Sequence, residues 1–168
     1  QQIIAGAVIV WAARLGPFLF RRIQKAGEDR RFRKIKLSTP RFLVTWTLQG
    51  TWVFLTAGAA LAAIMTPNTA PLGTVFFVGA AMWVLGFAVE VIADNQKSAF
   101  KADPANENKF ITTGIWARAQ HPNYFGEILL WAGVAVMALP SLSGSAMIFL
   151  ISPVFVAVLL TRISGVPL

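Results

Sequence analysis

The sequence contains no cysteine, and it has a single histidine and a single tyrosine among 168 residues. Without cysteine the chain can form neither disulfides nor thiolate metal sites, and it has no cysteine nucleophile. One histidine is too few for a zinc site of the usual kind, so no metal site is predicted. Charge is scarce as well, because Asp, Glu, Lys and Arg make up 13% of the residues. A soluble domain usually carries about a quarter of such residues, which argues against that class.

Long apolar runs take the place of the missing charge, and apolar residues make up 56% of the chain. These runs have the length of membrane-spanning helices and lack the strict alternation of membrane β-strands. The predicted fold is therefore all-α: a polytopic transmembrane helical bundle forming a single membrane domain over 1–168. About five spans are expected, at 2–20, 42–65, 72–93, 123–139 and 146–163.

The basic residues predict the orientation of these spans. Segment 21–41 carries nine basic residues and two acids, 95–120 is the second polar segment, and loops 66–71 and 140–145 have no charge. The positive-inside rule places both polar segments in the cytoplasm (or stroma), with the N-terminus outside. Arg14, inside the first run, is expected to extend its side chain toward 21–41.

The basic segment 21–41 itself allows two interpretations. Its main expected role is contact with anionic lipid headgroups. The alternative is that some of its arginines hold a phosphate-bearing cofactor. Nucleic acid is not an expected partner, because no aromatic or glycine-rich recognition pattern accompanies the charge.

Polar residues at helical spacing mark the cytoplasmic ends of the third and fourth spans. Glu90, Asp94, Lys97 and Lys101 follow one another at spacings of four, three and four, which places them along one helical stripe. This stripe predicts either a salt-bridged exit helix or a functional site, because an acid within an apolar run is costly unless it is paired.

The segment Gln120–Glu127 precedes the fourth span and holds the only histidine and tyrosine. Pro122 can begin a helix at its first position, and Asn123, Tyr124 and Glu127 then share one face. Taken singly, Tyr124 could anchor the helix at the membrane interface and His121 could cap a loop carbonyl. We expect Asn123 and Glu127 to converge with Glu90 and Asp94 in one cavity open to the cytoplasmic side.

Four segments in this order carry a resemblance to a known family: ARLGPFLFRRIQKAGEDRRF, EVIADNQKSAF, GIWARAQHPNYFGE followed by Trp131 and Gly133, and ISGVPL. Over essentially the whole chain, the sequence resembles bacterial and plastid-type membrane proteins of unknown function allied to the steroid 5-alpha-reductases. ADNQK and HPNYFGE together are fairly specific. A bare HPxY is also found in the isoprenylcysteine carboxyl methyltransferases, which the chain resembles more distantly.

The resemblance implies an NADPH-dependent reductase of a carbon–carbon double bond in a lipid or steroid-like substrate. Carried over by motif, Asp94, Asn123 and Glu127 would contact the cofactor. Lys101 and Lys109 stand near positions where the steroid reductases bind the phosphates. The predicted cofactor site also includes Arg118, His121 and Tyr124 from the same motif segment.

The sequence departs from the family pattern at three places. Ala119 and Gln120 stand where relatives commonly have Ser and Arg, which removes one expected cation. Relatives also continue beyond GVPL and begin before the WAARLG segment, so both ends of the chain are expected to be truncated. The helices that carry the substrate-polarising residues of steroid reductases lie in that earlier part, and the catalytic acid is therefore left unassigned.

Two other functions stay open on the sequence alone. One is a methyltransferase that uses S-adenosylmethionine, which HPNY before a membrane helix favours and which ADNQK and GVPL disfavour. The other is a non-catalytic subunit packed against other membrane subunits, to which the six tryptophans would suit lipid or pigment contact. In every case membrane lipids are expected neighbours, and a lipid-like substrate is expected only for an enzyme.

Overall fold

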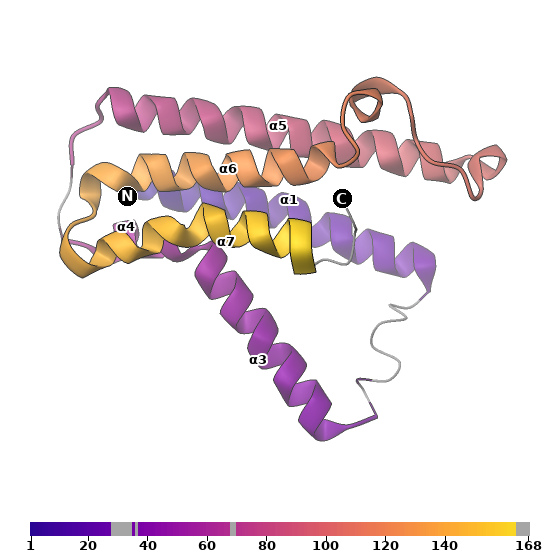
Figure 1. The fold of residues 1–168 in the computed structure, drawn as a ribbon, viewed down its shortest axis with the longest axis horizontal. Helices are drawn as coiled ribbons and strands as arrows, with labels where there is room; N and C mark the ends of the chain where they lie inside the picture. Colours follow the sequence, from indigo (N-terminus) through magenta and orange to yellow (C-terminus); the bar gives the residue numbers. More distant parts are fainter. Residues whose placement is uncertain (28–34, 36, 68–69, 164–168) are drawn as a thin grey trace.

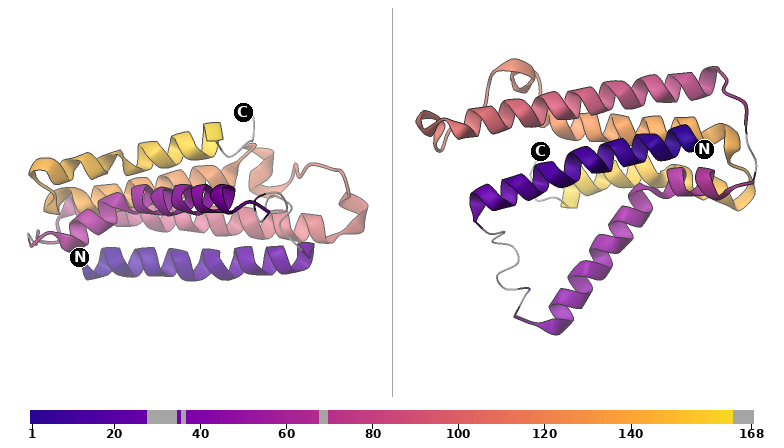
Figure 2. Two further views of the ribbon diagram at one scale, coloured as in Figure 1. Left: turned by 90° about the horizontal axis from the view of Figure 1, so that it is seen from below. Right: turned by 180° about the vertical axis from the view of Figure 1, so that it is seen from behind.

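The computed structural model describes residues 1–27, 35, 37–67 and 70–163, and none of these residues forms a strand. The longest helices are α1 (Gln2–Ala26), α3 (Thr39–Thr56), α5 (Thr74–Ala102) and α6 (Pro122–Ala138). Shorter helices are α4 (Gly58–Met65) and α7 (Ser152–Val158). Helices α1, α5, α6 and α7 run alongside one another, whereas α3 leaves the bundle at an angle (Figure 1; Figure 2). The predicted all-α bundle is confirmed.

Within the described ranges, four helical segments are long and apolar enough to cross a membrane: Gln2–Lys25, Thr74–Ala102, Pro122–Ser141 and Gly144–Arg162. A bent helix pair, Thr39–Thr56 with Gly58–Met65, would make a fifth span. The last segment is not uniform, since a 3-10 stretch (Gly144–Ile151) and a π-helical stretch (Leu159–Ile163) flank α7. The protein is therefore an integral membrane protein by the length and composition of its helices. Which face lies in the cytoplasm stays a prediction.

Residues 42–65, predicted as one span, form two helices, because the segment bends by 62° between α3 and α4. Small residues cover the inner face of α4, where Gly58, Ala59, Ala60 and Ala63 are buried, and none of the residues of α3 is buried. A Cβ on Gly58 would lie 2.9 Å from the Phe149 ring. The small side chains thus let α4 pack closely against the bundle. The bulkier α3 does not pack into the bundle and leaves it at an angle.

Glycines bring α5 and α6 into backbone contact. A Cβ on Gly86 of α5 would lie 2.6 Å from the carbonyl oxygen of Gly126, and one on Gly133 of α6 would lie 2.6 Å from that of Gly79. The two glycines of each helix are seven residues apart, so they recur on one face over two turns. This contact fixes the register of the two helices and sets Glu90 beside the first turns of α6, because a Cβ on Gly126 would lie 2.7 Å from the Glu90 amide nitrogen.

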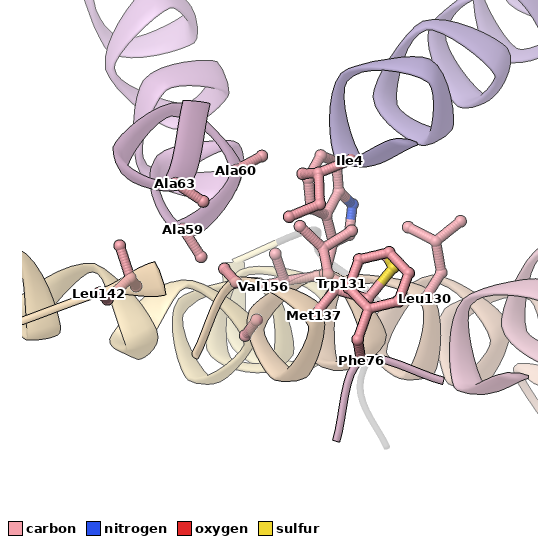
Figure 3. Close-up of a cluster of buried hydrophobic side chains, with 13 residues drawn as sticks. Ile4, Ala59, Ala60, Ala63, Phe76, Leu130, Trp131, Met137, Leu142 and Val156 are labelled. Atoms are coloured by element: carbon pink, nitrogen blue, oxygen red, sulfur yellow. The ribbon is translucent and has the colours of Figure 1, made fainter. Parts of the chain in front are cut away.

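The apolar core lies toward the end of the bundle opposite Glu90 and the first turns of α6. Side chains of α1, α4 and α5 meet those of α6 there, with Trp131 and Leu130 fully buried (Figure 3). Trp11 of α1 packs edge-on against Trp131, with ring centroids 5.0 Å apart. Ile4 is the only buried residue among the described side chains of α1. Helix α1 is thus held by apolar packing near its start. Its second half has no buried apolar side chain among those described, so another kind of contact must hold it against the bundle.

Candidate functional site

A cavity of about 210 Å³ lies between the second half of α1, the exit of α5 and the start of α6. Its α5 and α6 walls are polar and consist of Glu90, Asp94, Asn123 and Glu127, while α1 contributes Leu15, Phe18, Leu19 and Arg22. The lining residues of α1 recur at i, i+3, i+4 and i+7, and those of α5 and of α6 are four residues apart, so each set occupies one face. The expectation that the four polar residues meet in one cavity is confirmed. The side of the membrane to which it opens stays a prediction.

Arg14 of α1 links the helices that form this cavity. Its Nη1 atom donates to Glu90 Oε1 at 2.6 Å, and its Nη2 atom donates to Asp94 Oδ2 at 2.5 Å. The Glu90 and Asp94 side chains are 3% and 10% exposed, and that of Arg14 is 17% exposed. Phe18, one turn further on, places its ring 5.0 Å from the guanidinium carbon and so covers one face of the cation.

The ion pairs of Arg14 correct two expectations from the sequence. Arg14 does not extend toward the basic segment, because two acids on α5 hold it inside the bundle. The proposed salt-bridged exit helix is also wrong for these acids, since the described part of the chain pairs both with Arg14 rather than with the lysines of their own helix. The available signal was a cation within the first apolar run and an acid, Glu90, within the third, since charged groups inside membrane spans usually pair with one another.

Two oxygen atoms of the polar wall are buried without a hydrogen-bond partner among the described residues. They are Glu90 Oε2 and Asn123 Oδ1. A buried acceptor without a donor costs about 1–3 kcal/mol, and more when it is charged. Such atoms in a cavity wall are therefore suited to accept hydrogen bonds from a ligand. No group of three or more His, Asp or Glu side chains in the described ranges could hold a metal ion.

The loop between α5 and α6 is fastened to α5 just beyond the cavity. The Ile115 amide donates to Gln96 Oε1 at 3.1 Å, and the Trp116 indole donates to the Ala93 carbonyl at 3.0 Å. Lys97 lies 4.8 Å above the Trp116 ring. Gly114 adopts φ +62°, which glycine allows at low cost, and its missing side chain leaves room for Gln96. These contacts hold the segment that begins α6, and with it Asn123.

His121 and Tyr124 stack on each other near the start of α6, with ring centroids 5.0 Å apart and planes at 21°. Partial burial and the charge of Lys97 lower the pKa of His121. The imidazole is therefore neutral at pH 7, since its ordinary pKa is already about 6.5. Neither ring is among the cavity-lining residues, so the pair supports the helix start from outside the cavity.

The remaining predicted cofactor residues are placed differently from one another. Asp94, Asn123 and Glu127 line the cavity, whereas Lys101, Lys109 and Arg118 are exposed and do not line it. Their predicted contact with the cofactor stays a prediction. Arg22 lines the cavity but was expected only as one member of the basic segment 21–41, of which 28–34 and 36 lie outside the described residues.

Comparison with protein families gives one match over the full length. The model of the family described as "Protein of unknown function (DUF1295)" matches residues 1–168, and the chain belongs to this family. A search of curated proteins and a search of solved structures both gave no match.

Proposed function

We propose that the protein is, or descends from, an NADPH-dependent reductase of a carbon–carbon double bond in a lipid or steroid-like substrate. One observation supports this above the others: residues of both resemblance motifs line one cavity. Asp94 comes from ADNQK, and Asn123 and Glu127 come from HPNYFGE. The proposed relation to the steroid 5-alpha-reductases rests on these motifs.

The chemistry of the cavity fits one end of the cofactor. A nicotinamide riboside unit carries an amide and hydroxyl groups, which can donate to the unpartnered Glu90 Oε2 and Asn123 Oδ1. A volume of about 210 Å³ is below the roughly 300–1,000 Å³ of sites for drug-sized ligands, so the cavity would hold part of a dinucleotide. When bound, NADPH supplies the hydride. Arg22, which lines the cavity, could bind a phosphate at its edge, and Lys101, Lys109 and Arg118 lie outside the lining.

The apolar side of the cavity suits a lipid-like substrate. Leu15, Phe18 and Leu19 of α1 face the polar wall of α5 and α6. Water would be displaced from these three side chains when an apolar molecule binds, which favours binding. We propose that the motif face lies in the cytoplasm or stroma, where NADPH would be available to it.

One observation favours a second candidate, an S-adenosylmethionine-dependent methyltransferase. Three carboxylates line the cavity, and a sulfonium cation would be attracted to them. The third possibility, a non-catalytic subunit of a larger membrane complex, requires neither cofactor.

Ligand-induced stabilisation separates the three. NADPH at about 100 times its dissociation constant is expected to stabilise the purified protein by roughly 2.7 kcal/mol. Glu127→Ala should remove this effect while the protein stays folded, and Glu107→Ala is the matched control because Glu107 is exposed and outside the cavity. Stabilisation by S-adenosylmethionine alone would favour the methyltransferase. Stabilisation by neither, with co-purification in a larger assembly, would favour the subunit.

A further inference from the structure

The guanidinium of Arg14 is held by two acids and one aromatic ring. Its two terminal nitrogens each donate to a different carboxylate, and Phe18 covers one of its faces. Arg14 is also absent from the residues that line the cavity. Its effect on a ligand must therefore pass through the lining residues that it contacts, which are Glu90, Asp94 and Phe18.

Arg14 leaves one oxygen of Glu90 available to the cavity. The salt bridge uses Oε1, and Oε2 is buried without a partner among the described residues. Asn123 Oδ1 is the second such atom in the same wall, and the carboxylate of Glu127 lies in that wall as well. The fixed inner wall therefore presents hydrogen-bond acceptors, and Arg22 is the only cation among the described residues that line the cavity.

We infer that Arg14 is a positioning residue that determines ligand specificity: by fixing Glu90 and Asp94 it makes the cavity select a hydrogen-bond donor and reject an anion. This inference rests on the proposed function in that it specifies which end of the dinucleotide enters the cavity. An amide or hydroxyl group can donate to the two unpartnered oxygens, whereas a carboxylate has no hydrogen to donate and would leave them unpaired.

A matched pair of ligands tests this selectivity directly. NADP⁺ and its nicotinic acid analogue differ only in the replacement of the amide NH₂ by an oxygen, which exchanges a donor for an anionic acceptor. In detergent-solubilised chain, the amide form should bind at least about tenfold more tightly, because the hydrogen bonds that the amide donates are lost in the other. Equal affinities would overturn the inference while leaving the dinucleotide proposal intact.

Arg14→Lys tests the positioning role. A lysine ammonium cannot bridge two carboxylates as the planar guanidinium does, and its donors can turn toward an incoming anion. The preference for the amide form should fall to within about threefold, a change that general loss of packing would not produce. Arg21→Lys is the matched control on the same helix, because Arg21 is exposed and outside the lining, and it should keep the full preference. An unchanged preference in Arg14→Lys would overturn the positioning role.

A second pair of ligands, benzamide and benzoate, distinguishes failure of this inference from failure of the proposed function. If neither dinucleotide binds, the NADPH proposal is wrong, and benzamide and benzoate are then compared at millimolar concentration by thermal shift. Stabilisation by benzamide alone, lost in Asn123→Leu, supports the donor-selective cavity without any dinucleotide. Binding of benzoate as tightly as benzamide, or of neither compound, overturns it.

Discussion

Helices α5 and α6 differ from α1 and α3 in how they are held. The α5–α6 pair is in backbone contact through four glycines, and nine residues of α6 are buried. Helix α3 has no buried residue, and the second half of α1 is attached through the ion pairs of Arg14. The polar wall of the cavity therefore belongs to the tightly packed pair of α5 and α6. The position of its apolar wall, on α1, depends on the side chain of Arg14.

The largest effect is expected where the rigid pair is disrupted. Gly86→Val would place side-chain atoms against the backbone of Gly126 and Leu130, which cannot move without separating the helices. We expect a loss of about 4 kcal/mol or more in unfolding free energy, measured by denaturant titration in detergent. Gly6→Val on α1 is the control, because no atom lies within 4 Å of the position of its Cβ. Similar losses in both variants would contradict the contrast between the two regions.

Removal of Arg14 is expected to have the next largest effect. Arg14→Ala leaves Glu90 and Asp94 buried without their cation, and breaking a buried pair costs about 3–5 kcal/mol. Because Arg14 keeps some exposure, we expect the lower end of this range. Arg21→Ala, which removes an exposed arginine of the same helix, should change stability by less than about 0.5 kcal/mol. A loss in Arg14→Ala no larger than in this control would show that α1 is held by other contacts.

A smaller effect is expected in the loop that begins α6. Gly114→Ala adds a Cβ to a residue at φ +62°, at 2.6 Å from Gln96 Nε2. Gly144→Ala has a similar φ of +56° with no atom within 4 Å, so it carries the conformational cost of about 1 kcal/mol without the clash. Gly114→Ala should therefore lose about 1 kcal/mol more and speed hydrogen exchange over 113–121. Equal losses would mean that the Gln96 contact adds nothing to the order of this loop.

The smallest effect concerns the pH dependence of stability. Because the folded state lowers the pKa of His121, the unfolded chain binds more protons near and below its ordinary pKa of about 6.5. The contribution of His121 to stability is therefore present at pH 7.5 and lost as the pH falls through 6.5. The decrease in Tm between pH 7.5 and 5.5 should be smaller in His121→Gln. An identical decrease would assign the pH dependence to other groups.

Local spacing was sufficient to predict much of the cavity. Glu90 with Asp94 and Asn123 with Glu127 are four residues apart, and they lie near the facing ends of two consecutive helices, so their convergence follows from a helical hairpin. The role of Arg14 did not follow, because its partners are 76 and 80 residues away and depend on the placement of α1. The bend at Ala57 was missed because residues 42–65 carry no charge and no proline, and hydropathy carries no information about helix direction.

The most direct test of this account is a double-mutant cycle between α1 and α5. Arg14→Gln, Asp94→Asn and the double variant are compared by their unfolding free energies in detergent. Because the two side chains form an ion pair in a part-buried site, we predict that the double variant loses at least about 1 kcal/mol less than the sum of the single losses. Single losses that add to within about 0.5 kcal/mol would show that Arg14 and Asp94 are not coupled, and would contradict the attachment of α1 to the polar wall through Arg14.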